Sequence, residues 1–556
     1  MKKKFAMFLC LLCLITTLFL TLTGCKAKEA KTTNGSSSSE LSAPGVFPLV
    51  KNKVTLKFFA PQNVNIKDMN TNAFTTFYEN KTNVHIQWEL VPSDALTDKR
   101  SLALASNDLP DVFFGAGVTK EEEMLYGTQG IFLPLNKYID KQGVEIKKMF
   151  AAVPVVKPGI TTPNGSIYSL PQENQCYHCW FSQKLWINSS WLKKLNLEMP
   201  KTTDDILKVY RAFRDNDPNG NGKKDEYALS GANIKTSWHS NPVDYFMCAF
   251  IYDDGGDRLS LENGKVDVNF NKPEFKEGLK FMNTMWKEKL IDPAAFTQDE
   301  ATLKQVGENP AAEILGSVTV GFFGSFTSLT GTRMKNYDAV PPLKGPNGVQ
   351  TTGWYPYDYA AGQYVITKAC TNPELAYKWA DWLYSDEATF LYVECGREGK
   401  EWKKASATDK DLNGNPAKWM RTDTYAYGEI QNVHYYQMGP SFRSREYRES
   451  WGSPQDPYAE KGYELRLQLE TKPYEAFKPA TVFPPVYMDA SAVKEIAQIK
   501  TPINDYVNES IAAFVTGNMD IEKEWDKYTK NLESLNLKRY IELQQKAFDS
   551  SSFAKK

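Results

Sequence analysis

The sequence predicts a mixed α/β protein, and three observations support that prediction. Residues 54–60 and 85–90 have the composition and alternation of strands, and residues 69–81 between them have helical periodicity. Further strand and helix patterns alternate after them, which indicates βαβ units and a sheet covered on both faces. The chain of 556 residues is long enough for several domains or for two large lobes.

The remaining elements follow from the same reasoning. Pro273 opens a helix because the first helical turn does not need its missing N–H, and Thr203 is the expected N-cap of the helix that follows Pro200. We expect a break at Gly517 in the helical C-terminal stretch. The expected helices are 95–105, 191–195, one opening at 203, 273–289, 373–390 and the stretch 490–548, and the expected strands are 111–114, 185–188, one within 312–323, and 364–366.

The N-terminal segment predicts export. Residues 1–24 have a basic start and an apolar run (5–20) that is short for a membrane span, as in a signal peptide. The run ends in Leu22-Thr-Gly-Cys25, which resembles the lipobox of bacterial lipoproteins and implies cleavage before Cys25 and its lipidation, palmitate included. An uncleaved N-terminal anchor is the alternative. Residues 25–48 then form a flexible tether, and the protein is anchored on the extracytoplasmic face of the cell membrane.

Composition excludes some classes of function. The formal net charge is -1, so the sequence predicts neither a nucleic-acid-binding surface nor an acidic tail. Only four histidines occur in the chain, which argues against a histidine-based metal site. Cys176 and Cys179 form a C-x-x-C, but no second pair at zinc-ligand spacing accompanies it. A disulfide and two free thiols remain equally open for this pair.

The stretch 215–226 (DNDPNGNGKKDE) predicts a calcium site. Side-chain oxygens recur at every second position, and calcium accepts six to eight such ligands. The pattern fits in two registers, one starting at Asp215 and one at Asp217, and the alternative is a plain Asn/Gly turn. We expect a structural ion rather than a calcium sensor. The predicted ligands are Asp217, Asn219, Asn221, the carbonyl of Lys223, Asp225 and Glu226.

Longer motifs resemble one known family. Two motifs resemble hallmarks of extracellular solute-binding lipoproteins that serve carbohydrate ABC importers. The first is 169–171 (SLP) together with the stretch 185–202 (LWINSSWLKKLNLEMPKT), and the second is the helix 376–387 (AYKWADWLYSDE). The calcium loop and the ending 520–549 resemble the calcium-bearing branch that includes alginate-oligosaccharide binders. The sequence departs from this pattern at Asn196 and in the insert 175–180 (QCYHCW).

The resemblance implies an α/β fold of two lobes, each a mixed sheet flanked by helices, that closes on its ligand like the clamp of periplasmic binding proteins. The first lobe would comprise 49–174 and about 362–435, and the second 175–361 and about 436–556. It further implies a monomer that captures a carbohydrate, most simply an oligosaccharide, and delivers it to the permease subunits of an ABC importer. The calcium ion would be structural, bound in the Asp217 register and away from the sugar.

Aromatic rings beside polar groups predict the ligand site, because rings cover the C–H face of a sugar and polar side chains satisfy its hydroxyls. For any single ring, packing in the core or on the surface is the alternative. The expected ligand residues are Glu173, Tyr177, Trp180, Trp238, His239, Trp354, Tyr355 and Asp358, with Gln62 as a weaker candidate. Arg443, Arg445 and Arg448 could bind an acidic sugar, but we expect them in a solvated loop.

We expect a binding protein rather than an enzyme. The G-x-S-x-G, H-E-x-x-H and P-loop motifs do not occur. Two rival classes stay open: an exported carbohydrate hydrolase or lyase, which needs converging carboxylates or a Tyr/His pair, and a cell-surface adhesion or scaffold lipoprotein.

Overall fold

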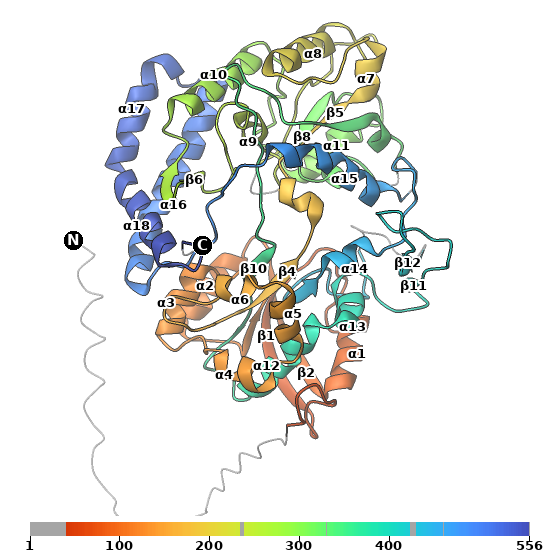
Figure 1. Cartoon of the computed structure of the whole chain (residues 1–556), viewed down its shortest axis with the longest axis vertical. Coiled ribbons are helices and arrows are strands. Elements are labelled where there is room, and N and C mark those ends of the chain that lie inside the picture. The colour runs from red at the N-terminus through yellow and green to blue at the C-terminus, as the bar shows by residue number, and fades with distance from the viewer. Residues whose placement is uncertain (1–40, 234–237, 330, 423–429, 460, 555–556) are drawn as a thin grey trace, which may run out of the picture. The chain divides into compact units, whose positions relative to one another are not determined.

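The computed structural model describes residues 41–556 except 234–237, 330, 423–429, 460 and 555–556, and residues 41–556 form one unit (Figure 1). The predicted signal peptide and Cys25 lie outside the described residues. Within the described part of the chain, we find no helix that combines the length and the apolar character needed to span a membrane.

The strands of the described residues form two main sheets and two hairpins. One sheet has six strands in the order β13-β4-β10-β3-β1-β2, and the other has three in the order β8-β5-β9. The strands are β1 (Val54–Gln62), β2 (Val84–Pro92), β3 (Val112–Phe114), β4 (Leu170–Asn174), β5 (Leu185–Asn188), β6 (Leu259–Glu262), β7 (Lys265–Val268), β8 (Ser317–Thr319), β9 (Tyr337–Val340), β10 (Tyr359–Ile366), β11 (Trp402–Lys404), β12 (Trp419–Arg421) and β13 (Ser441–Arg443).

Helices pack around these sheets, and α16, α17 and α18 lie against one another near the C-terminus (Figure 1). The helices are α1 (Ala73–Thr82), α2 (Leu96–Ser106), α3 (Lys120–Thr128), α4 (Asn136–Gln142), α5 (Glu145–Ala152), α6 (Val156–Gly159), α7 (Ser189–Lys194), α8 (Thr203–Asp215), α9 (Pro242–Met247), α10 (Pro273–Lys287), α11 (Glu300–Gly307), α12 (Pro373–Asp381), α13 (Asp386–Ala388), α14 (Arg445–Glu449), α15 (Tyr463–Thr471), α16 (Ala490–Thr516), α17 (Ile521–Ser534) and α18 (Leu537–Ser550).

The six-stranded sheet is mixed and covered on both faces, as the sequence predicts. β1 pairs in parallel with β2 and β3, and β10 runs antiparallel to β3 and β4. Successive side chains of a strand point to opposite faces. Phe58 therefore packs on one face with Trp379 of α12, at 5.0 Å between ring centroids, while Phe59 packs on the other with Phe113 at 5.3 Å.

The second sheet has a separate core. All four residues of β5 are buried, and the ring of Trp186 lies 4.5 Å from that of Phe323. The strands β8, β5 and β9 are antiparallel, and a parallel bridge from Ser230 to Val318 makes the sheet mixed. The two cores draw on different parts of the sequence. The protein is therefore an α/β fold of two lobes, each with a mixed sheet flanked by helices.

Some boundaries differ from the predicted ones. Helix α1 begins at Ala73 rather than 69, because the side chain of Asn72 caps it by accepting the N–H of Phe74. Thr202, not Thr203, is the N-cap of α8, in a capping box with Asp205. The helix expected over 373–390 ends at Asp381 and restarts at Asp386 after a turn.

Residues 41–48, which we place in the tether, lie on the folded unit. Leu41 forms a bridge with Val50, and Phe47 packs at 6.1 Å from Trp382. The ammonium of Lys378 donates to the carbonyl of Ala43 at 3.1 Å. Only residues before Leu41 remain for the predicted tether. The lobe boundaries stay a prediction, but β13 pairs with β4 and lies just beyond the boundary proposed near residue 435.

Candidate functional site

Most of the predicted ligand residues lie where the chain passes between the two sheets. The chain leaves the six-stranded sheet after β4 and returns to it at β10. These strands are neighbours: Glu173 pairs with Tyr359, and the backbone N–H of Asn174 donates to the carbonyl of Asp358 at 3.1 Å. The sheet register therefore brings Glu173 and Asp358, which are far apart in sequence, to adjacent positions.

Glu173 and Asp358 are two buried carboxyl groups that influence each other. Glu173 is 1% exposed, and neither of its carboxylate oxygens has a hydrogen-bond partner among the described residues. Burial, and then the charge of Asp358, raises the pKa of Glu173 to about 8. Burial also raises the pKa of Asp358 to about 7. A buried carboxyl group without a hydrogen-bond partner is costly, so Glu173 is a candidate to contact a ligand that brings hydrogen-bond donors or acceptors.

A disulfide-closed turn carries the first aromatic cluster. Cys176 and Cys179 form a disulfide, which settles the open question about this C-x-x-C. The following 3₁₀ turn, Tyr177–Phe181, places the rings of Tyr177 and Trp180 edge to face at 6.2 Å. The indole N–H of Trp180 donates to Asp358 Oδ1 at 2.5 Å, which joins this turn to the carboxyl pair.

A second cluster surrounds Tyr355. Its backbone N–H donates to the carbonyl of Trp180 at 2.9 Å, so the two clusters are continuous. Its hydroxyl accepts from Gln183 Nε2 at 3.1 Å and donates to the carbonyl of Asp254. The ring of His239 lies 5.0 Å from that of Tyr355. Burial lowers the pKa of His239 to about 4, so this imidazole is neutral at physiological pH.

Trp238 presents an open aromatic surface beside His239, with ring centroids 5.1 Å apart. The indole is 41% exposed. It rests on Gly321, where a Cβ would lie 2.5 Å from a ring carbon. A large exposed ring supported by backbone in this way is suited to stacking against the C–H face of a sugar.

The structure does not bring two of the predicted ligand residues into these clusters. Gln62 is exposed at the end of β1, and the described contacts do not link it to the other ligand residues. Trp354 precedes Tyr355 in the chain, but its ring lies under the ammonium of Lys478, with the Nζ 5.1 Å from the ring centroid.

Sequence reasoning missed or misplaced several residues of the site. Gln183 and Asp254 contact Tyr355 and had no motif to mark them.

The prediction of a solvated loop for the three arginines is wrong for Arg443, which is 3% exposed. Arg448 donates to Asn174 Oδ1 at 3.2 Å, and the guanidinium of Arg445 lies 5.0 Å from the centroid of the Trp180 ring. These contacts depend on the pairing of β13 with β4, which no local pattern predicts.

The predicted calcium loop follows directly from the end of α8. Asp217 and the glycines of the loop adopt positive φ, at 74° for Gly220 and 75° for Gly222, where glycine avoids the strain of a side chain. The carboxylate of Asp217 accepts the backbone N–H groups of Gly220, Asn221 and Gly222 at 2.9 to 3.1 Å. These bonds hold the pKa of Asp217 below its usual range.

Acidic groups converge in this loop. The amide groups of Asn219 and Asn221 donate to Asp225 at 3.1 Å. Glu226 Oε1 is buried without a hydrogen-bond partner among the described residues, and burial, together with the charges of Asp217 and Asp225, raises the pKa of Glu226. A buried, unpartnered carboxylate oxygen beside two other carboxylates fits a hard cation.

Two observations define this donor set further. Asp215 forms a two-bonded ion pair with Arg214, at 2.7 and 2.8 Å, so its carboxylate is engaged outside the loop. This pairing favours the register that begins at Asp217. Among the described residues, however, Cys176, His178 and Cys179 are the one group of three or more acidic, His and Cys side chains whose ligand atoms lie within 4.8 Å of one another, and the disulfide uses both of these sulfurs. The carboxylates of the described loop do not form such a group.

A second stretch, 409–415 (DKDLNGN), repeats the D-x-D-x-N-G spacing, which the sequence analysis missed. The side chain of Asp411 accepts the N–H groups of Asn413 and Asn415 at 2.8 and 2.9 Å, and Asp409 accepts that of Ser406. Among the described residues, none of these side-chain oxygens is buried without a hydrogen-bond partner, as Glu226 Oε1 is. This stretch is a turn stabilised by its own side chains.

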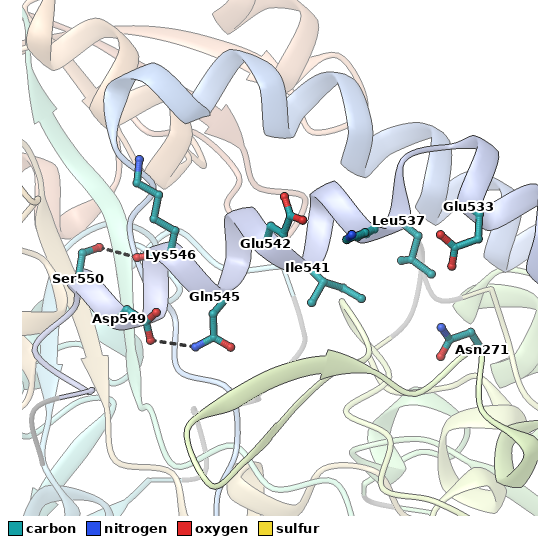
Figure 2. A pocket seen from close by; sticks show the side chains of 10 residues that line it. Asn271, Glu533, Leu537, Ile541, Glu542, Gln545, Lys546, Asp549 and Ser550 are labelled. Carbon is teal, nitrogen blue, oxygen red and sulfur yellow. Dashed lines mark hydrogen bonds between the residues drawn. The ribbon is translucent and has the colours of Figure 1, made fainter.

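A groove on the C-terminal helices is separate from this site. Figure 2 shows that most of its lining residues are spaced along α18, among them Leu537 and Ile541, with Asn271 opposite. Gln545 donates to Asp549 at 2.8 Å within it. None of the predicted ligand or calcium residues lines this groove.

Known proteins are similar in sequence to this chain over much of its length. The family described as bacterial extracellular solute-binding protein matches residues 63–390. The chain is 31% identical over 550 residues to the fructooligosaccharide ABC transporter substrate-binding protein FusA of Streptococcus pneumoniae, covering 96% of this chain and 97% of FusA. Lipoprotein LipO of Bacillus subtilis is 25% identical over 71% of this chain and 74% of LipO.

Solved structures give the same result. FusA in complex with kestose superposes with a TM-score of 0.76 at 29% identity, over 89% of this chain and 99% of FusA. The alginate-binding protein AlgQ2 without calcium ion superposes with a TM-score of 0.70 at 22% identity, over 90% of this chain and 99% of AlgQ2, which shows the shared fold. The chain therefore belongs to the family of bacterial extracellular solute-binding proteins.

Proposed function

We propose that this protein binds an oligosaccharide at the junction of its two lobes and delivers it to an ABC importer. The observation that carries the proposal is the buried pair Glu173 and Asp358, joined to Trp180 and continuous with the rings around Tyr355. FusA, which is related over nearly the whole chain, is named for fructooligosaccharides and was solved with kestose, which supports the proposal.

The arrangement matches the two faces of a sugar. The open indole of Trp238 covers an apolar C–H face, while Glu173 and Asp358 satisfy hydroxyl groups as acceptors when ionised and as donors when protonated. A sugar that contacts both lobes at once stabilises the closed state relative to the open one, and the permease then recognises the closed protein.

The charges favour a neutral sugar over a uronic acid. The cations near the site are already engaged: Arg445 pairs with Glu449 at 3.2 Å, and Lys184 donates to the carbonyl of His178 at 3.0 Å. At neutral pH Glu173, with a pKa of about 8, is mostly protonated, and Asp358, with a pKa of about 7, is partly ionised, so repulsion of an acidic sugar would come mainly from Asp358.

A calorimetric titration tests this proposal. Kestose and longer neutral fructooligosaccharides should bind, while oligogalacturonides and alginate oligosaccharides of similar length should not. Preference for the acidic sugars would contradict the charge argument, and binding of neither class would remove the proposed ligand.

We propose a structural calcium ion at the loop 217–226. Its holders would be Asp217, Asn219, Asn221, Asp225 and Glu226 with the carbonyl of Lys223, and the orphaned oxygen of Glu226 supports this set. A FusA structure is of an EF-hand mutant, in complex with fructo-nystose, which is consistent with such a loop in a relative. The ion would offset repulsion between the carboxylates and so order the loop.

The location also remains a proposal. We propose that Cys25 is lipidated and anchors a monomer on the extracytoplasmic face of the membrane, supported by the lipobox in the sequence and by the relative named lipoprotein LipO. Cys25→Ala should release the protein from membranes or leave the precursor uncleaved. A Cys25→Ala variant that is still processed and still sediments with membranes would contradict this.

One observation keeps the hydrolase alternative worth testing. Glu173 and Asp358 are adjacent carboxyl groups with raised pKa, which is the kind of pair a glycosidase uses. The relatives are named as binding proteins, and we therefore expect bound kestose to be recovered intact. Chromatography after prolonged incubation that showed its monosaccharide products would support the enzyme instead.

A further inference from the structure

The disulfide Cys176–Cys179 lies at the start of the turn that carries Tyr177 and Trp180. It is the one disulfide among the described residues. Cys248, Cys370 and Cys395 are buried and are not disulfide-bonded. The position of this bond raises the question of whether it serves stability or the ligand site.

The bond closes a very short loop. Only Tyr177 and His178 separate the two cysteines, so cross-linking removes little freedom from the unfolded chain compared with a long loop. It also ties no distant elements together. Its main effect is therefore local, on a turn in which the N–H of Cys179 donates to the carbonyl of Cys176 at 3.0 Å.

That turn sets the geometry of the ligand site. Trp180 directly follows Cys179, donates to Asp358 and receives the N–H of Tyr355 on its carbonyl. Tyr177 lies between the two cysteines, and its hydroxyl donates to Glu475 at 2.6 Å. Loosening the turn would shift both rings relative to the carboxyl pair.

The surroundings favour the reduced thiols more than an apolar core would. Burial lowers the pKa of His178, and the charges of Arg448, Lys184 and Arg443 lower it further. Its Nδ1 lies 4.0 Å from the sulfur of Cys179. Nearby cations stabilise a thiolate, which makes a disulfide easier to reduce. Cys179 is half-buried, whereas Cys176 is 1% exposed, so an external thiol would reach Cys179 first.

We propose that the Cys176–Cys179 disulfide is a thiol-responsive switch on ligand binding: the oxidised form holds Tyr177 and Trp180 in the binding geometry, and reduction weakens binding without unfolding the protein. The switch rests on the proposed oligosaccharide function, and its reductant is an external dithiol. One thiolate of the dithiol attacks the sulfur of Cys179, the bond breaks, and Cys176 leaves as a thiolate that takes up a proton. The second thiol then displaces Cys179 as a thiol, and the dithiol is oxidised to a disulfide.

The test combines thiol trapping, hydrogen exchange and titration of kestose on the full-length protein. Excess dithiothreitol should reduce the bond in the folded state, increase hydrogen exchange at residues 176–184 and weaken kestose binding about tenfold, the loss of one well-placed ring contact. The double variant Cys176→Ser/Cys179→Ser should match reduced wild type and ignore dithiothreitol. Cys370→Ser, whose cysteine is buried in the first core, should behave as wild type.

The outcomes separate the switch from the proposed function. A bond that stays oxidised in the folded protein overturns the switch, as does a reduced protein that unfolds or keeps unchanged exchange at 176–184. Unchanged kestose affinity after reduction also overturns it. If kestose binds neither form, the proposed ligand fails, and the exchange result at 176–184 alone decides whether the turn responds to thiols.

Discussion

The proposed calcium loop and the proposed ligand site are built differently, although each contains a partly or fully buried acidic group whose pKa is raised. The loop gathers its oxygens from ten consecutive residues, and backbone N–H groups lower the pKa of Asp217. The ligand site draws its groups from β4, β10 and the crossing segments, and burial raises the pKa of Glu173 and Asp358. This difference is consistent with the proposals that the loop binds a cation and that the site binds hydroxyl groups.

This contrast explains which site could be found in the sequence. A local loop leaves its whole pattern in one stretch, whereas a site built by sheet pairing leaves single residues scattered along the chain. The predictions below test the contrast, from the largest expected effect to the smallest.

The largest effect should be in the pH dependence of stability. Glu173 has a pKa of about 8 in the folded protein and an ordinary pKa of about 4.5, so its contribution to stability is fully present below pH 4.5 and is lost as pH rises toward 8. We expect the free energy of unfolding to fall by up to several kcal/mol over this window. Denaturant titrations at several pH values should show a flatter profile for Glu173→Gln.

Asp217 of the calcium loop should contribute to stability in the opposite sense. The lowered pKa of Asp217 means that its contribution is present above the unfolded value and is lost on acidification through the folded pKa. If the free energy of unfolding of Glu173→Gln fell with rising pH as much as that of wild type, the contrast between the ligand site and the calcium loop would be contradicted.

Removal of calcium should have the next largest effect. An ion at a hundred times its dissociation constant adds about 2.7 kcal/mol of stability, so a chelator should lower the melting temperature by several degrees and added calcium should restore it. Asp217→Ala should abolish this response, because Asp217 is a proposed ligand and its carboxylate accepts three backbone N–H groups of the loop. Thermal unfolding with and without chelator measures it.

Asp215→Ala and Asp409→Ala are the controls for that experiment. Asp215 pairs with Arg214, and Asp409 belongs to the self-stabilised turn 409–415. Both variants should keep the calcium response. If Asp215→Ala loses it as fully as Asp217→Ala, the loop begins at Asp215.

Trp238→Ala should cost about 1–3 kcal/mol of binding free energy for kestose, with little loss of stability, because 41% of this residue is exposed. Gly321→Ala should also weaken kestose binding, because the added Cβ would displace the Trp238 ring that packs on Gly321. Calorimetry measures both. Gly256→Ala is the matched control, because the nearest atom to its added Cβ is 3.8 Å away.

The smallest effect should come from Arg445. Its guanidinium lies over the rings of Trp180 and Tyr177 at 5.0 and 5.7 Å but is partly exposed. We expect Arg445→Ala to weaken kestose binding by about 0.5–1 kcal/mol and Arg445→Lys by less. A loss as large as that of Trp238→Ala would mean that Arg445 binds the sugar directly.

The sequence predicted what is local. The strand-helix alternation of residues 54–114, the loop at Asp217 and the family motifs were readable because each occupies one stretch. The register that places Glu173 beside Asp358 was not readable, since it depends on β10 returning next to β4. The burial of Arg443 and the packing of Trp238 against Gly321 also depend on tertiary structure. Gln62 and Trp354 lie outside the clusters that the other predicted ligand residues form, and their role in ligand binding stays a prediction.

The most direct test of the account is a calorimetric titration of kestose into wild type and Trp238→Ala, with both proteins folded and saturated with calcium. The account predicts binding by wild type at a stoichiometry of one and a loss of about 1–3 kcal/mol in the variant. Equal affinity of the two proteins, or binding of kestose to neither while an acidic oligosaccharide binds, would contradict it.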